Sequence, residues 1–259
     1  MPYTWSQRIA RAQKLAPDSA ARDLLNLYIK VTAFQKIVGE GLQEANHRQI
    51  DSVLQFLPEF RILVHDLGEA PLVESRVGEL GSNRELWSEL LAQYWEGNVP
   101  KEDPAGVFLA HVLLQPYAEH LACHTAIAGG DSNLSCPVCN RPPLLSVLRE
   151  LNNGAKRFLL CSLCSTEWEF RRVLCSYCSE QHPDKLPVFT NEKFAHVRIE
   201  ACDTCKSYTK SINLSEDGNA VPQADDLTTL ALDFWAHGQG YTRHTANIFL
   251  IPCTTPQFQ

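Results

Sequence analysis

Four copies of one short pattern decide the fold of this chain: Cys136-Pro-Val-Cys139, Cys161-Ser-Leu-Cys164, Cys175-Ser-Tyr-Cys178 and Cys202-Asp-Thr-Cys205. These C-x-x-C pairs take up eight of the ten cysteines. A C-x-x-C pair at a tight turn presents two thiolates to one metal ion, and a second pair completes a tetrahedron. The four pairs therefore predict two metal sites with four cysteines each.

The spacing of the pairs predicts which of them combine. The first and second pairs are 21 residues apart and the third and fourth are 23 apart, as in two metal-binding turns joined by a strand-rich segment. Ten residues separate the second pair from the third, which suits a linker. We expect the first pair to join the second and the third to join the fourth; an interleaved arrangement stays open. The expected ligands are Cys136, Cys139, Cys161 and Cys164 at one site and Cys175, Cys178, Cys202 and Cys205 at the other.

Other roles for these thiols fit the sequence less well. Disulfides need an oxidising compartment, and a thioredoxin-type dithiol is usually a single pair after a strand of a βαβ unit. Sulfur-only ligation suits iron or zinc, one ion per site, and the residue types do not separate the two metals. Four thiolates leave no open coordination position, so the sites are predicted to be structural or electron-transferring. Such turns need a positive φ after the second cysteine, where this chain has Asn140, Ser165, Ser179 and Lys206.

Composition and charge disfavour two further classes of protein, nucleic-acid-binding and membrane-spanning. The chain has 259 residues and a net charge of −7, and its cysteine-rich stretch 131–210 carries 11 Lys/Arg against nine Asp/Glu. That balance argues against a nucleic-acid-binding ribbon, which needs a clearly basic face. No window approaches the roughly 18 apolar residues of a membrane span, and the N-terminus lacks the apolar run of a signal peptide. We expect a cytoplasmic protein.

The predicted fold class is α+β. Apolar residues at steps of three and four predict an all-α domain over residues 1–130, with Gly39 and Gly41 ending its first long helix. Alternating strands around the cysteines predict two small rubredoxin-like or zinc-ribbon-like β modules, over residues 131–174 and 175–259. The second module is expected to include a C-terminal helix that begins at Leu227 and is capped by Asp225 and Asp226.

A few further residues invite a functional interpretation. His120 and His124 share a helical face, with His111 nearby, but the segment offers no third ligand at a clear spacing, so a metal pair there is disfavoured. Cys123 is expected to be a buried apolar residue, and Cys253 is left over. No nucleotide-binding glycine loop or catalytic triad is evident, and the chain is not expected to be an enzyme.

The motifs together resemble one family. Cys136-Pro-Val-Cys139 with Pro142, Cys161-Ser-Leu-Cys164 with Glu167-Trp168, the run from Glu200 to Lys210, and Asp225-Asp-Leu-Thr-Thr-Leu-Ala-Leu-Asp233-Phe-Trp235 resemble the formate dehydrogenase accessory proteins of the FdhE type. The resemblance implies a maturation factor that associates in the cytoplasm with the molybdenum-containing catalytic subunit of a formate dehydrogenase. It also implies that the eight paired cysteines are ligands in rubredoxin-like sites. The alternatives are a zinc-ribbon nucleic-acid-binding protein and a thiol redox protein.

Overall fold

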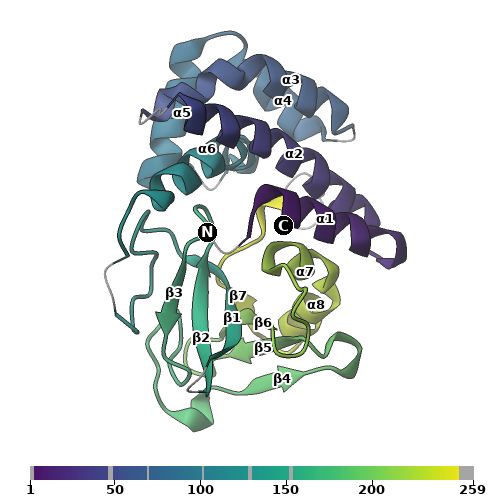
Figure 1. The fold of residues 1–259 in the computed structure, drawn as a ribbon, viewed down its shortest axis with the longest axis vertical. Helices are drawn as coiled ribbons and strands as arrows, with labels where there is room; N and C mark the ends of the chain where they lie inside the picture. Colours follow the sequence, from purple (N-terminus) through teal and green to yellow (C-terminus); the bar gives the residue numbers. More distant parts are fainter. Residues whose placement is uncertain are drawn as a thin grey trace.

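The computed structural model describes residues 3–45, 49–68, 70–100, 102–127, 130–151 and 154–250. A bundle of helices from the first half of the chain lies on a mixed β-sheet from the second half (Figure 1). This arrangement confirms the predicted α+β class. The helices of the bundle are α1 (Trp5–Leu15), α2 (Arg22–Glu44), α3 (Leu57–Asp66), α4 (Pro71–Leu80), α5 (Arg84–Glu96) and α6 (Pro104–Cys123), with 3₁₀ turns at Ala16–Asp18 and Ile50–Phe56.

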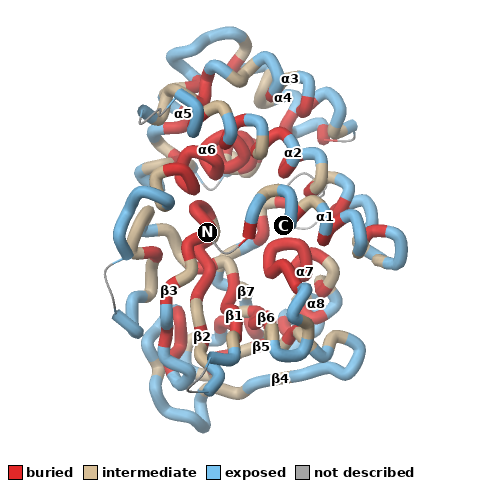
Figure 2. The backbone as a smooth tube through the Cα atoms, in the orientation of Figure 1, coloured by how far each residue is buried: buried red, intermediate tan, exposed pale blue. Residues whose placement is uncertain are grey.

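Helix α6 forms the centre of the helical half and is buried along most of its length (Figure 2). Its sequence is apolar all round rather than on one stripe, which is typical of a helix enclosed by others. Asp103 caps its start by accepting a hydrogen bond from the Gly106 N–H at 2.7 Å. Pro116 lies inside the helix, which continues to Cys123. None of the described helices is long and apolar enough to cross a membrane.

Helix α2 does not end at Gly39 and Gly41, as expected from the sequence, but continues to Glu44. The reason is a close contact. A Cβ atom on Gly41 would lie 2.7 Å from the ring of Phe56, so the glycine lets that ring pack directly on the helix. The two glycines therefore serve helix packing, and the prediction that they terminate the helix is wrong.

The sheet has the strand order β3-β2-β1-β6-β5-β4, with the short β7 beside β6. Its strands are β1 (Pro143–Leu151), β2 (Gly154–Cys161), β3 (Glu167–Phe170), β4 (Val188–Thr190), β5 (Val197–Ala201), β6 (Ser207–Asn213) and β7 (Thr242–Arg243). Strands β1, β2 and β3 pair antiparallel with one another, and so do β4, β5 and β6, whereas β1 and β6 pair in parallel. The two predicted modules thus share one sheet, joined at the β1–β6 pair.

The two modules repeat the same order of parts. In each, a cysteine turn precedes two strands, and a second cysteine turn leads into the third strand. Because β1 and β6 run parallel and each follows a cysteine turn, both pairs of turns lie at the same end of the sheet. The division into domains 1–130, 131–174 and 175–259 stays a prediction, and Gly129, at the expected first boundary, lies outside the described residues.

The C-terminal helical segment differs in detail from the expected single helix. It forms α7 (Pro222–Thr228) and α8 (Leu230–Gly238). Asp225 and Asp226 lie inside α7 and are almost fully buried, so the prediction that they cap a helix is wrong. Their carboxylates pair with cations from distant parts of the chain: Asp225 with Arg11 of α1, at 2.5 Å, and Asp226 with Lys210 of β6, at 2.7 Å.

Candidate metal centres

The eight paired cysteines converge on two places. Two quartets each bring their sulfur atoms within 4.8 Å of one another: the first cluster is Cys136, Cys139, Cys161 and Cys164, and the second cluster is Cys175, Cys178, Cys202 and Cys205. This is the grouping expected from the spacing, and the interleaved alternative does not occur. All eight thiols are free of disulfides.

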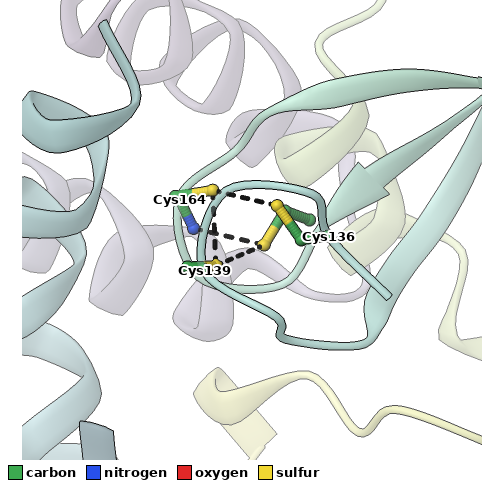
Figure 3. Close-up of side chains that lie close together, drawn as sticks. Cys136, Cys139 and Cys164 are labelled. Carbon is green, nitrogen blue, oxygen red and sulfur yellow. Dashed lines mark hydrogen bonds between the residues drawn. The ribbon is translucent and has the colours of Figure 1, made fainter. Parts of the chain in front are cut away.

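The distances between sulfurs suit a tetrahedral ion. In the first cluster, the Cys139 sulfur lies 3.3 Å from that of Cys161 and 3.5 Å from that of Cys164. In the second, the Cys178 and Cys202 sulfurs are 3.7 Å apart. A metal–sulfur bond of about 2.3 Å places tetrahedral sulfurs about 3.8 Å apart, while a disulfide would require about 2.05 Å. Figure 3 shows the side chains of Cys136, Cys139 and Cys164 turned toward one another.

Each cysteine turn has the same main-chain design. The N–H of the first cysteine donates to the carbonyl five residues later at 2.8 to 2.9 Å in all four turns. The residue after the second cysteine takes a left-handed conformation, at Asn140 (φ 57°), Ser165 (φ 53°), Ser179 (φ 62°) and Lys206 (φ 55°). No other non-glycine residue in the described part of the chain has a positive φ. The turns thus keep their geometry without the glycine that would adopt it freely.

Main-chain N–H groups also point at the sulfurs. The Val138 N–H donates to Cys136 Sγ, the Leu163 N–H to Cys161 Sγ and the Tyr177 N–H to Cys175 Sγ, each at 3.4 Å. Such bonds stabilise negative charge on a thiolate. Burial, together with the neighbouring sulfurs, nevertheless raises the pKa of the Cys161 thiol. Four thiolates at this spacing therefore need a cation among them, which is the chemistry of a metal site.

The two clusters differ in exposure. In the first, Cys136, Cys161 and Cys164 are at most 2% exposed. The second includes Cys178, which is exposed to solvent. The difference arises because the first cluster lies against the helical half: Ser165 Oγ donates to Glu119 of α6 at 2.8 Å. The second cluster is covered on one side by the C-terminal segment, where the His244 ring lies 3.8 Å from that of Tyr177.

The other sequence candidates give no metal site. The rings of His120 and His124 lie 5.0 Å apart, but no third ligand joins them among the described residues. Cys123 is exposed, so the expectation that it is buried is wrong; it lies in the last turn of α6, where the helix leaves the core. Cys253 lies outside the described residues.

The sequence did not predict one further cluster of polar side chains. His196, Asp217 and Asp225 also lie within 4.8 Å of one another. Arg11 already fills the space between the two carboxylates, 2.7 Å from Asp217 and 2.5 Å from Asp225. The group is an ion-pair network that ties α1 to the sheet half. No local sequence pattern predicts this network, because its members come from three distant parts of the chain.

Comparison with known proteins agrees with the geometry. Residues 135–172 match the FdhE central domain and residues 173–250 match the FdhE C-terminal domain. A Pseudomonas putida FdhE homolog is 30% identical over 95% of this chain and 86% of its own length. The chain belongs to the FdhE family. The match to FdhE homologs from Aquifex aeolicus, at 38% identity, and Haemophilus influenzae, at 32%, spans only 40% and 55% of their lengths.

The fold of the family is also known from a crystal structure. The FdhE protein from Pseudomonas aeruginosa superimposes with a TM-score of 0.71 over 96% of both chains, at 24% sequence identity. That likeness extends over the helical half, which neither matched FdhE domain covers. The helical bundle and the sheet are therefore both part of the FdhE architecture.

Proposed function

We propose that this protein is an accessory factor for the maturation of a formate dehydrogenase. In this proposal it binds the molybdenum-containing catalytic subunit in the cytoplasm and is not itself an enzyme. The observation that carries the proposal is the pair of four-cysteine clusters on a chain whose FdhE relationship covers almost its full length. Fully ligated sulfur sites leave no open position for a substrate.

The metal sites have a defined role in this proposal. Cys136, Cys139, Cys161 and Cys164 hold one ion, and Cys175, Cys178, Cys202 and Cys205 hold the other. Zinc would be structural, whereas iron bound by four thiolates exchanges one electron. In either case the two cysteine turns of a module, one before its first strand and one before its third, would hold the ion together. Metal binding of this kind contributes on the order of 10 kcal/mol to folding.

Affinity purification from a strain that makes formate dehydrogenase tests the client. We expect the tagged full-length protein to retain the catalytic subunit, and a deletion strain to lose formate oxidation. The variant Cys136→Ser/Cys139→Ser should fail in both assays, because the first cluster connects to the helical half through Ser165 and Glu119. Cys123→Ser is the matched control, since that thiol is exposed and outside both clusters.

Absence of the catalytic subunit from the purified complex, combined with normal formate oxidation in the deletion strain, would refute the proposal. Elemental analysis of protein purified without added metal gives the metal content independently. We expect two ions per chain, and the visible spectrum separates coloured iron–thiolate sites from colourless zinc sites.

A further inference from the structure

The C-terminal segment, residues 241–250, extends from the second cluster to the helical half. It begins beside the cysteine turns with β7 and ends against the helices in a 3₁₀ turn, Ile248–Leu250. In Figure 1 it is the yellow stretch that leaves β7 and runs toward the helical bundle. None of its residues belongs to either four-cysteine cluster. Its contacts nevertheless connect the second cluster to the helices.

The start of the segment is bonded to the fourth cysteine turn. The Thr242 N–H donates to the Lys206 carbonyl at 2.8 Å, and Lys206 directly follows Cys205 of the second cluster. β7 is two residues long and pairs in parallel with β6, which begins at Ser207. So short a strand has little stability of its own, since even an isolated two-stranded hairpin is marginal in water. The position of β7 therefore depends on the turn that precedes β6.

The third cysteine turn contacts the same part of the segment. Tyr177 lies inside the Cys175–Cys178 turn, and the centre of its ring is 3.8 Å from that of the His244 ring. The third and fourth turns contribute two sulfurs each to the second cluster, so an ion bound there fixes their positions relative to each other. The start of the segment thus contacts two turns whose relative position depends on the ion.

The end of the segment packs against α2 and α7. The Phe249 ring, 6% exposed, meets the Tyr28 ring of α2 edge to face, with the ring centres 4.9 Å apart. The Asn247 side chain donates to Asp226 of α7 at 2.8 Å and accepts from the Phe249 N–H at 3.1 Å. Arg243 of β7 also pairs with Asp226, at 2.9 Å, so contacts connect β7 to the helices through this carboxylate. Chains of packed and hydrogen-bonded groups of this kind carry energetic coupling between distant sites.

From these contacts we infer that the C-terminal segment couples the ion at the second cluster to the packing of the helical half. When the ion is bound, the two turns hold the start of the segment, and residues 247–250 stay packed on α2 and α7. When the ion is absent, the turns are no longer tied to each other, so the segment loses their support and loosens at its far end. Coupling between two sites is reciprocal, so weakening the far end also lowers the affinity of the second cluster for its ion. The inference rests on the metal sites of the proposed function and does not depend on the client.

Amide hydrogen exchange on the zinc-loaded full-length protein tests the effect of the ion on the segment. Cys178→Ser removes one ligand of the second ion, and we expect the amides of Phe249 and Leu250 to exchange at least about fivefold faster in that variant. Both amides are hydrogen-bonded to Asn247 at 3.1 Å, so their exchange reports the packing of the far end. The amides of β3, which follows the first cluster, should keep their rates, and the control Cys123→Ser should leave Phe249 and Leu250 unchanged. Unchanged exchange at Phe249 and Leu250 in Cys178→Ser, or equal acceleration in β3, would overturn the inference.

Zinc affinity tests the reciprocal effect. In equilibrium competition with a chelator, Phe249→Leu should weaken the second site at least about fivefold and leave the first site unchanged. Phe60→Leu is the matched control, because that ring is also buried in the helical half but packs on Phe34 and Trp87. His244→Ala removes an exposed ring at the start of the segment and should weaken the second site in the same way, which decides the matter if Phe249→Leu does not fold. Unchanged affinity of the second site in either folded variant would overturn the inference.

The same samples separate this inference from the proposed function. The zinc site that is missing in Cys178→Ser identifies the second site in the competition experiment. Uptake of a single zinc ion by the wild type would overturn both the coupling and the proposed metal sites. Absence of the catalytic subunit from the purified complex would count against the proposed function alone.

Discussion

Lys210 offers a direct test of how burial sets the strength of an ion pair in this fold. The side chain is fully buried, and its Nζ lies 2.7 Å from Asp226 and 2.5 Å from Asp233. Arg243 contacts the same two carboxylates at 2.9 and 3.2 Å. Burial alone would raise the pKa of the Asp226 carboxyl, but Arg243 and Lys210 outweigh it and hold that pKa below its usual range. The four charges connect β6, α7, α8 and β7.

Replacement of Lys210 by methionine keeps most of the side-chain volume and removes the charge. The buried carboxylate of Asp226 and the partly buried carboxylate of Asp233 are then left with the single cation of Arg243. Loss of one partner from a buried pair costs about 3–5 kcal/mol, since the other charge stays in a medium that solvates it poorly. With a urea slope of about 3 kcal/mol per M, the unfolding midpoint should fall by about 1 M or more.

Lys156 supplies a matched control on another strand of the same sheet. Its Nζ lies 2.8 Å from Glu169, but the two side chains are 42% and 49% exposed. An exposed pair contributes about 0.2–1 kcal/mol, so Lys156→Met should move the urea midpoint by about 0.3 M or less at the same slope. Equal shifts in the two variants, measured on metal-loaded protein, would refute the reasoning that burial rather than distance sets the effect.

Three further perturbations have defined outcomes. A chelator should release metal in two phases, because Cys178 exposes the second cluster, and Cys178→Ser should abolish only the faster phase; a single phase in the wild type would contradict the difference in exposure. Ser179→Gly should stabilise the protein by about 0.5 kcal/mol in chemical denaturation, since glycine adopts the positive φ of 62° freely; destabilisation would show that the turn is not strained. Burial, with a contribution from Arg141, lowers the pKa of His111 to about 3. The unfolded chain, in which this histidine titrates at about pH 6.5, therefore binds about one more proton at pH 5 than the folded chain does. The free energy of unfolding should thus fall by about 2 kcal/mol between pH 7 and pH 5. His111→Gln should remove that part of the pH dependence, as measured by urea midpoints; an unchanged slope would contradict the buried, neutral imidazole.

The cysteine clusters could be predicted because most of the information is local. Each turn closes its own hydrogen bonds within five residues, as from the Cys136 N–H to the Arg141 carbonyl at 2.8 Å. The need for a positive φ at Asn140, Ser165, Ser179 and Lys206 also follows from the turn alone, and the structure has it at all four positions. Spacing along the chain then suffices to combine the turns into quartets.

The β1–β6 pair that joins the modules could not be predicted in the same way. β1 has the sequence Pro-Leu-Leu-Ser-Val-Leu-Arg-Glu-Leu, whose leucines do not alternate with polar residues and suit a helix equally well. Its partner Ser211 lies 65 residues after Ser146 and belongs to the other module. Such pairing depends on the assembled fold rather than on a local pattern.

The dependence on distant parts of the chain also explains why Asp225 and Asp226 were wrongly predicted to cap a helix. Two acidic residues before an apolar run are typical of a helix start, and nothing nearby indicates otherwise. Their true partners, Arg11 and Lys210, come from the first helix and from β6.

The parallel junction of β1 with β6 has a consequence for any attempt to dissect the chain. A fragment ending at residue 174 would lack β6, so the main-chain groups along that edge of β1 would lose their hydrogen-bond partners. The buried side chains of Leu145 and Val147 would become exposed to solvent. A fragment beginning at residue 175 would leave β6 without its partner β1. Exposed strand edges of this kind pair with other copies of the chain, which leads to aggregation. The two halves of the repeat are therefore expected to persist in solution only when they are made as one polypeptide.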